Sequence, residues 1–100
     1  MADNYLSKGI SVLPANFSVG DKIRISYDGL LAKSGAKDIT LHIGYGKNWR
    51  NTTDLKMKKT PTGFESTLSV VSSESISVSF HDDSNNWDNN SGRNYIFDVI

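Results

Sequence analysis

The stretch SISVSF at residues 75–80 alternates strictly between small polar and large apolar side chains. Successive side chains of a β-strand point to opposite faces, so this alternation gathers Ile76, Val78 and Phe80 on one face. A strand with one apolar face has to bury that face against another layer of the protein. The stretch therefore predicts a half-buried strand that belongs to a packed sheet.

The same period of two recurs along the chain, and turn residues such as Pro14, Gly29, Pro61 and Gly63 separate the apolar runs. No segment has the three-and-four spacing of a sustained helix, and residues 30–37 are expected to form a loop. The predicted strands lie at residues 10–12, 22–27, 39–43, 55–57, 64–70, 76–80 and 95–99. About seven or more short strands predict an all-β, immunoglobulin-like antiparallel β-sandwich.

The length and the charge limit the classes of protein to consider. A chain of 100 residues suits one domain, so residues 1–100 are expected to form a single module. Lys and Arg together number 11, as do Asp and Glu, so nucleic acid and membrane surfaces are not expected as partners. The absence of cysteine excludes disulfides and thiolate zinc sites, and it gives no information on the compartment.

Two segments, residues 44–51 and 81–90, break the alternation and carry the two tryptophans, Trp49 and Trp87. Their neighbours are Asn, Asp, Lys and Arg rather than apolar residues, so both indoles are expected to be at least partly exposed. The alternative is that each indole covers one end of the sandwich.

An exposed indole among amides and carboxylates suits a sugar ligand. A pyranose ring stacks its C–H face on an aromatic ring and presents hydroxyls around its rim. Asn89 and Asn90 supply hydrogen-bond donors and acceptors, and Asp88 supplies acceptors. The alternative for each of these residues is turn chemistry, in which the side chain binds its own backbone.

The run WDNN at residues 87–90, followed by Gly92 and by Asn94-Tyr95, resembles the W-D-N-N-x-G-x-N-Y signature of family-25 carbohydrate-binding modules and of the related family-53 modules. A strand that carries His42 and is followed by a loop tryptophan, Trp49, also resembles these families. The resemblance covers residues 39–100. It implies a β-sandwich that binds α-1,4- and α-1,6-glucans and does not catalyse a reaction.

Carried onto this chain, the resemblance makes Trp49 and Trp87 stacking platforms and His42 a third ring, with Asn89 or Asn90 binding glucose hydroxyls. The alternation independently turns His42 away from the core face of its strand. Strands that simply alternate up and down would place the two tryptophan loops at opposite ends of the sandwich. Either Trp49 folds back or the strand count differs. No metal or cofactor is expected.

The resemblance further implies starch, glycogen or maltooligosaccharides as ligands and an appended or associated glycoside hydrolase, such as an amylase. The chain starts without a basic run followed by an apolar segment, and no stretch could span a bilayer. We expect an extracellular location if the module is cut from a secreted amylase, and a cytoplasmic one if the chain is complete as given.

Calcium binding and catalysis fit the residues less well. Asp82, Asp83 and Asp88 allow an irregular calcium site, but an EF-hand loop starting at Asp82 would need glycine at Trp87. A hydrolase needs a positioned pair of carboxylates or a nucleophile with its base, and no such group is evident. The protein is therefore not expected to be an enzyme.

Two other binding functions use the same aromatic residues. A protein-interaction or adhesion sandwich would place them at the centre of an interface, although that use favours aliphatic neighbours over amides. Single-stranded nucleic acid would stack on them beside a basic stretch, which Asp54 interrupts. That stretch consists of Lys47, Arg50, Lys56, Lys58 and Lys59.

Overall fold

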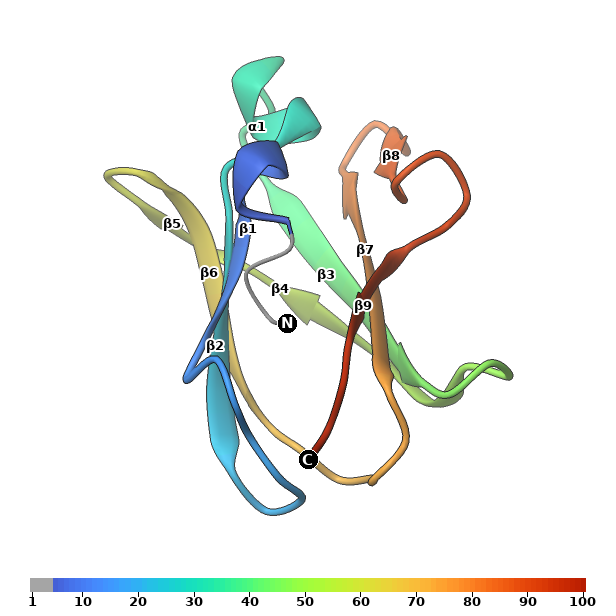
Figure 1. The fold of residues 1–100 in the computed structure, drawn as a ribbon. Helices are drawn as coiled ribbons and strands as arrows, with labels where there is room; N and C mark the ends of the chain where they lie inside the picture. Colours follow the sequence, from blue (N-terminus) through green and yellow to red (C-terminus); the bar gives the residue numbers. More distant parts are fainter. Residues whose placement is uncertain (1–4) are drawn as a thin grey trace.

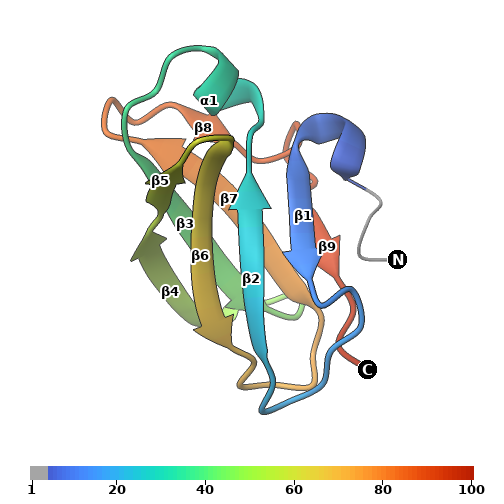
Figure 2. The ribbon, with the colours of Figure 1, turned by 90° about the vertical axis from the view of Figure 1, so that its left-hand side faces the viewer.

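The computed structural model describes residues 5–100, which form two antiparallel sheets packed face to face (Figure 1). The first sheet, which faces the viewer in Figure 2, has the order β1-β2-β6-β5. Its strands are β1 (Ile10–Leu13), β2 (Lys22–Tyr27), β6 (Gly63–Ser69) and β5 (Lys58–Thr60). The predicted antiparallel β-sandwich is confirmed.

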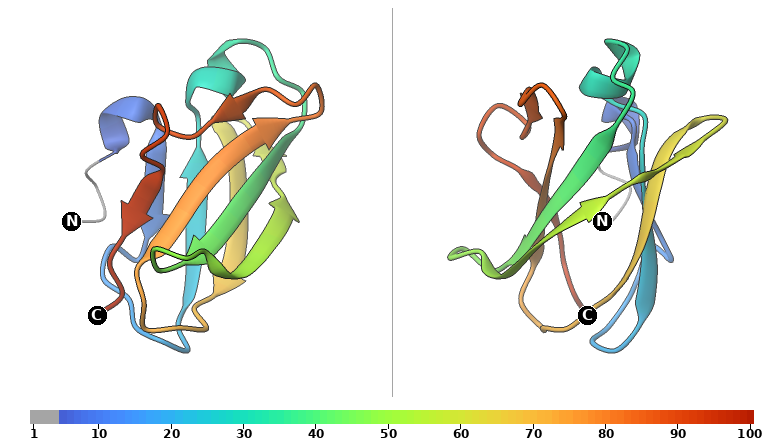
Figure 3. Two further views of the ribbon diagram at one scale, coloured as in Figure 1. Left: turned by 90° about the vertical axis from the view of Figure 1, so that its right-hand side faces the viewer. Right: turned by 180° about the vertical axis from the view of Figure 1, so that it is seen from behind.

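The second sheet faces the viewer on the left of Figure 3 and has the order β4-β3-β7-β8, with β9 also paired to β7. Its strands are β4 (Arg50–Lys56), β3 (Ile39–Tyr45), β7 (Ile76–Asp82), β8 (Trp87–Asp88) and β9 (Tyr95–Phe97). The described residues thus form nine short strands, in agreement with the expected seven or more. Each of the two central strands, β3 and β7, leads into one of the two tryptophan-bearing segments.

The core lies between the sheets and follows the alternation of the sequence. Ile76, Val78 and Phe80 of β7 are fully buried, as the stretch at residues 75–80 predicted. Ser77 and Ser79 lie on the opposite phase of β7, yet both are buried as well. Because serine is not an apolar core residue, this burial indicates that other side chains cover the outer face of the second sheet.

Three local predictions were wrong. The fourth strand starts at Arg50 rather than near Leu55, because backbone pairing with β3 holds a polar segment that has no apolar alternation. The short strands β5 and β8 were not predicted, since two or three residues cannot display a period. The loop predicted at residues 30–37 contains the short helix α1 (Leu30–Lys33).

The helical segments lie at one end of the sandwich. α1 and the 3₁₀ turn η1 (Leu6–Lys8) sit at the same end as β8, at the top of Figure 1. Within residues 5–100, no helix is long and apolar enough to cross a membrane. The two segments border a hollow that is described below.

Candidate functional site

Trp49 lies on the outer face of β3, where Gly44 leaves room for it. Residues 46–49 connect β3 to β4, and Trp49 adopts the left-handed backbone conformation with φ of 51°, which is uncommon for a non-glycine residue. A Cβ atom at Gly44 would lie 3.0 Å from Cδ2 and 3.1 Å from Cα of Trp49, and closer still to Cε3. The missing side chain of Gly44 therefore lets the indole lie against the strand, where it is half-buried.

His42 lies next to Trp49 on the same face of β3. The two rings stack with centroids 5.1 Å apart and planes inclined by 20°. Asp54 stands opposite His42 in the β3–β4 pairing, and its Oδ1 contacts His42 Nδ1. The imidazole is held between a carboxylate and an indole, and its side chain remains 31% exposed.

Trp87 reaches the same face from β8, which pairs with β7 so that Trp87 stands opposite His81. The indole lies 4.5 Å from the His81 ring, and its plane is perpendicular to that of His42, at 89° and 5.6 Å. Its Nε1–H donates to Asn85 Oδ1 at 3.0 Å, and the residue is 43% exposed. We call Trp49, His42, Trp87 and His81 the aromatic platform.

The platform joins two loops that start at opposite ends of the second sheet. On the left of Figure 3 the β3–β4 connection projects from the lower end of the sheet, and β8 crosses its upper end. Trp49 folds back from its loop toward His42, as one of the two sequence alternatives required. The strand count also differs from the expected one, but β3 and β7 pair antiparallel and their following loops still lie at opposite ends, so the fold-back of Trp49 brings the two tryptophans together. Ser77 and Ser79, small and buried, face outward between the two loops and leave space for the rings.

The turn before Trp87 is held by one carboxylate. Asp82 accepts hydrogen bonds from the backbone N–H groups of Ser84 and Asn86 and from the Asn86 side-chain amide, at 2.8 to 3.0 Å. The Asn86 side-chain and backbone donors hold the pKa of the Asp82 carboxyl below its usual range. This network fixes the position from which β8 and its tryptophan start.

The acidic residues considered for calcium point in different directions. Asp82 binds its own turn, and the Asp88 carboxylate faces inward. Within residues 5–100, no group of three His, Cys, Asp or Glu side chains is arranged to hold a metal ion.

Asp88 lies beneath the site rather than on its surface. It is 6% exposed, and its two carboxylate oxygens accept hydrogen bonds from Tyr27 at 2.6 Å and Tyr95 at 2.7 Å. Burial, followed by the hydrogen bond to Asp88, raises the pKa of both tyrosines. The Tyr27 hydroxyl also accepts the backbone N–H of Leu31 at 3.0 Å. Asp88 was expected to offer acceptors to a sugar, but both its oxygens are already used in tying β8 to β2, β9 and α1.

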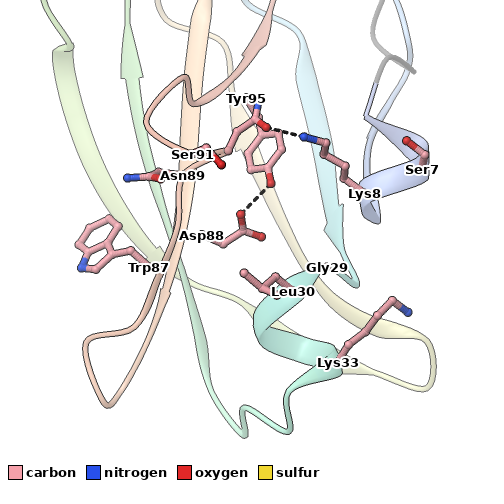
Figure 4. Close-up of a pocket in the computed structure, with 11 residues that line it drawn as sticks. Ser7, Lys8, Gly29, Leu30, Lys33, Trp87, Asp88, Asn89, Ser91 and Tyr95 are labelled. Atoms are coloured by element: carbon pink, nitrogen blue, oxygen red, sulfur yellow. Dashed lines mark hydrogen bonds between the residues drawn. The ribbon is translucent and has the colours of Figure 1, made fainter.

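The two asparagines after Asp88 differ in direction. Asn89 Oδ1 accepts the backbone N–H of Gly92 at 3.0 Å, and Figure 4 shows its side chain on the same side of β8 as Trp87. Asn90 Oδ1 accepts from Lys8 Nζ at 2.6 Å, and Asn90 Nδ2 donates to the Asn94 carbonyl at 3.0 Å. Both side chains perform turn chemistry, and of the two only Asn89 stands beside the platform.

Sequence reasoning missed three contributors to the platform. The outward phase of His81 was visible in the alternation but carried no assignment. Asp54 could have been found only from the strand register, because it lies in a segment without alternation. Gly44 gave no signal at all, since its importance depends on the indole that rests on it.

Comparison with known proteins identifies the family of the chain. The family model described as starch/carbohydrate-binding module, family 53 (CBM53), matches residues 23–87. No curated protein and no solved structure was found to match the chain. The matched range starts at the second residue of β2 and ends at Trp87, so most of the W-D-N-N-x-G-x-N-Y run lies beyond it. The chain belongs to family 53 of the starch- and carbohydrate-binding modules, a non-catalytic family.

Proposed function

We propose that this module binds α-glucan chains of starch, glycogen or maltooligosaccharides across the aromatic platform. Family membership supports starch or carbohydrate as the ligand class. The choice of an α-linked chain rests on the inclination of the two indoles. Trp49 is inclined by 20° to His42 and Trp87 by 89°, so the indole planes differ by at least 69°, the difference between these angles.

Two steeply inclined stacking faces suit a curved polymer. Successive glucose units of an α-glucan turn along a helix, whereas those of cellulose form a flat ribbon that needs coplanar rings. One face of the Trp49 indole rests on Gly44 and His42, which leaves the other for the ligand. Trp87 receives a neighbouring unit. In this proposal, the His42 ring packs against Trp49 and the His81 ring against Trp87, and both histidines hold the indoles in place rather than forming a third stacking surface.

Hydrogen bonds add to the stacking at the edge of the platform. Asn89 lies on the same side of β8 as Trp87, so its amide can reach a sugar that stacks there (Figure 4). Asp88 and Asn90 contribute by holding β8 and the following loop. Since exposed amides gain little over water, we expect an affinity roughly in the micromolar to millimolar range. Attachment to a polymer or to a linked enzyme would raise the effective strength by avidity.

The proposed role is to hold an appended or associated glucan-active enzyme on its polymer. We also propose that the whole chain acts as one module, which is supported by a single cluster of buried apolar residues that spans both sheets. One cooperative thermal transition for the isolated chain would support this second proposal, and two separate transitions would refute it.

Calorimetric titration with maltoheptaose and with cellohexaose tests the function. We expect saturable heat only with the α-linked sugar, and its loss in Trp49→Ala and Trp87→Ala. Leu13→Ala is the matched control, because it truncates an exposed apolar side chain on the other sheet. Equal binding of both sugars, or unchanged binding in either tryptophan variant, would contradict the proposal.

A further inference from the structure

A hollow adjoins the aromatic platform at the end of the sandwich. It has a volume of about 480 Å³ and lies between η1, α1 and the chain around β8 (Figure 4). Its walls include Ser7, Lys8, Leu30, Lys33, Trp87 and Asn90. Small-ligand sites commonly measure about 300–1,000 Å³, so this groove has the size of a binding site.

The chemistry of the groove is two-sided. Leu30, the first residue of α1, is 63% exposed, whereas the next residue, Leu31, is buried. Lys8 and Asn90, which hydrogen-bond each other, supply polar groups on another wall. Exposed apolar surface beside convergent hydrogen-bonding groups is the combination that a sugar unit requires, with its C–H faces and its rim of hydroxyls.

The charge of the groove favours a neutral ligand over an anion. Lys33 Nζ lies 3.4 Å from Asp28 Oδ2, which offsets its charge. Lys8 is the other cation on the wall, and the Asp88 carboxylate lies beneath the groove. A neutral polyol therefore fits this site better than a phosphate or a carboxylate.

The walls come from distant segments that are fixed to one another. Lys8 Nζ donates to Asn90 Oδ1 at 2.6 Å and joins η1 to the loop after β8. Asp88 and Tyr27 join β8 to the backbone of α1 through the Leu31 N–H. A groove whose walls are already hydrogen-bonded is ready for a ligand without rearrangement, which lowers the entropic cost of binding.

Trp87 belongs both to the platform and to the rim of the groove. The Trp87 indole points away from the groove, so a chain that stacks on it has to cross β8 toward α1 before its next units reach the groove (Figure 4). We propose that the groove is an extension subsite, which binds the glucose units of the same α-glucan chain that extend past Trp87. This inference rests on the proposed function and adds to it a dependence on chain length.

Titrations with maltotriose and maltoheptaose test the extension subsite. Wild type should bind the longer sugar more tightly. Leu30→Ala removes the apolar wall, and Ser7→Trp fills the groove from η1. Both should weaken maltoheptaose binding about three- to tenfold, the range that one exposed contact contributes, and leave maltotriose binding within about twofold of wild type. Ser73→Trp, in an exposed turn between β6 and β7, is the matched control for a bulky insertion.

The outcomes separate the two proposals. If wild type binds maltotriose and Trp49→Ala abolishes that binding, the platform stands. The extension subsite is then refuted if maltoheptaose binds no more tightly than maltotriose, or if the groove variants change both sugars equally or neither. Absence of binding to either sugar would refute the platform itself. Amide shifts at Leu30 and Ser91 that appear with maltoheptaose but not with maltotriose would give independent support.

Discussion

Gly44→Ala should disable the platform without removing any aromatic ring. The new methyl group would lie 3.0 Å from Trp49 Cδ2, whereas ordinary carbon contacts begin near 3.4 Å. The indole must therefore retreat by at least about 0.4 Å at this atom, and further at Cε3. Trp49 Cα, at 3.1 Å, would also have to shift, so the turn at residues 46–49 moves with the ring.

The magnitude follows from these contacts. Forcing a methyl group into a packed position lowers the free energy of unfolding by about 1–3 kcal/mol, and replacing glycine by alanine within a strand raises it by roughly 0.5–1 kcal/mol. We expect a net loss of about 1–2 kcal/mol in the free energy of unfolding. Displacing one stacking face should weaken maltoheptaose binding by about tenfold, the equivalent of one aromatic pair.

Calorimetry with maltoheptaose and tryptophan fluorescence provide the assay, with chemical denaturation as the measure of stability. Gly35→Ala is the control, because its methyl group enters open space and its cost arises only from the positive φ of 93°. In a Trp49→Ala background, Gly44→Ala should cause no further loss of binding. Wild-type affinity and unchanged tryptophan emission in Gly44→Ala would refute the proposed packing of Trp49 on β3.

The remaining predictions concern the residues that support the two indoles. Asp54→Ala should free the His42 ring and weaken maltoheptaose binding about two- to fivefold in calorimetry, as expected for the loss of one exposed hydrogen bond that orients a ring. Tyr95→Phe removes one donor to the buried Asp88 and should lower the free energy of unfolding by about 1–3 kcal/mol in urea titrations; no change would contradict the hydrogen-bonded role of Asp88. Because the pKa of Tyr95 is raised in the folded protein, stability should fall as the pH rises above the ordinary tyrosine value of 10.0, and Tyr95→Phe should reduce that fall. The pKa of Asp82 is lowered on folding, so its contribution to the stability of the turn before Trp87 is present above the ordinary value of 3.8 and is lost as the pH falls below it. The fluorescence of Trp87 should therefore change in this acid range in wild type and not in Asp82→Asn.

The sequence by itself determined the features that depend on local pattern. Alternation in SISVSF predicts its buried and outward faces, because the side-chain period of a strand is two wherever the strand lies. Polar neighbours predicted that Trp87 is exposed, and the outward phase of His42 follows from the same alternation. Each of these conclusions needs only a few consecutive residues.

Tertiary structure decided which of the candidate residues meet. Trp49 reaches His42 only because Gly44 lacks a side chain at the place where the loop turns back, and His81 meets Trp87 only through the β7–β8 register. The Asp88 carboxylate points toward two tyrosines from other strands, and no residue next to Asp88 in the sequence indicates this direction. Contacts between segments far apart in the chain depend on strand register and on the space between side chains, and a local pattern of polarity contains neither.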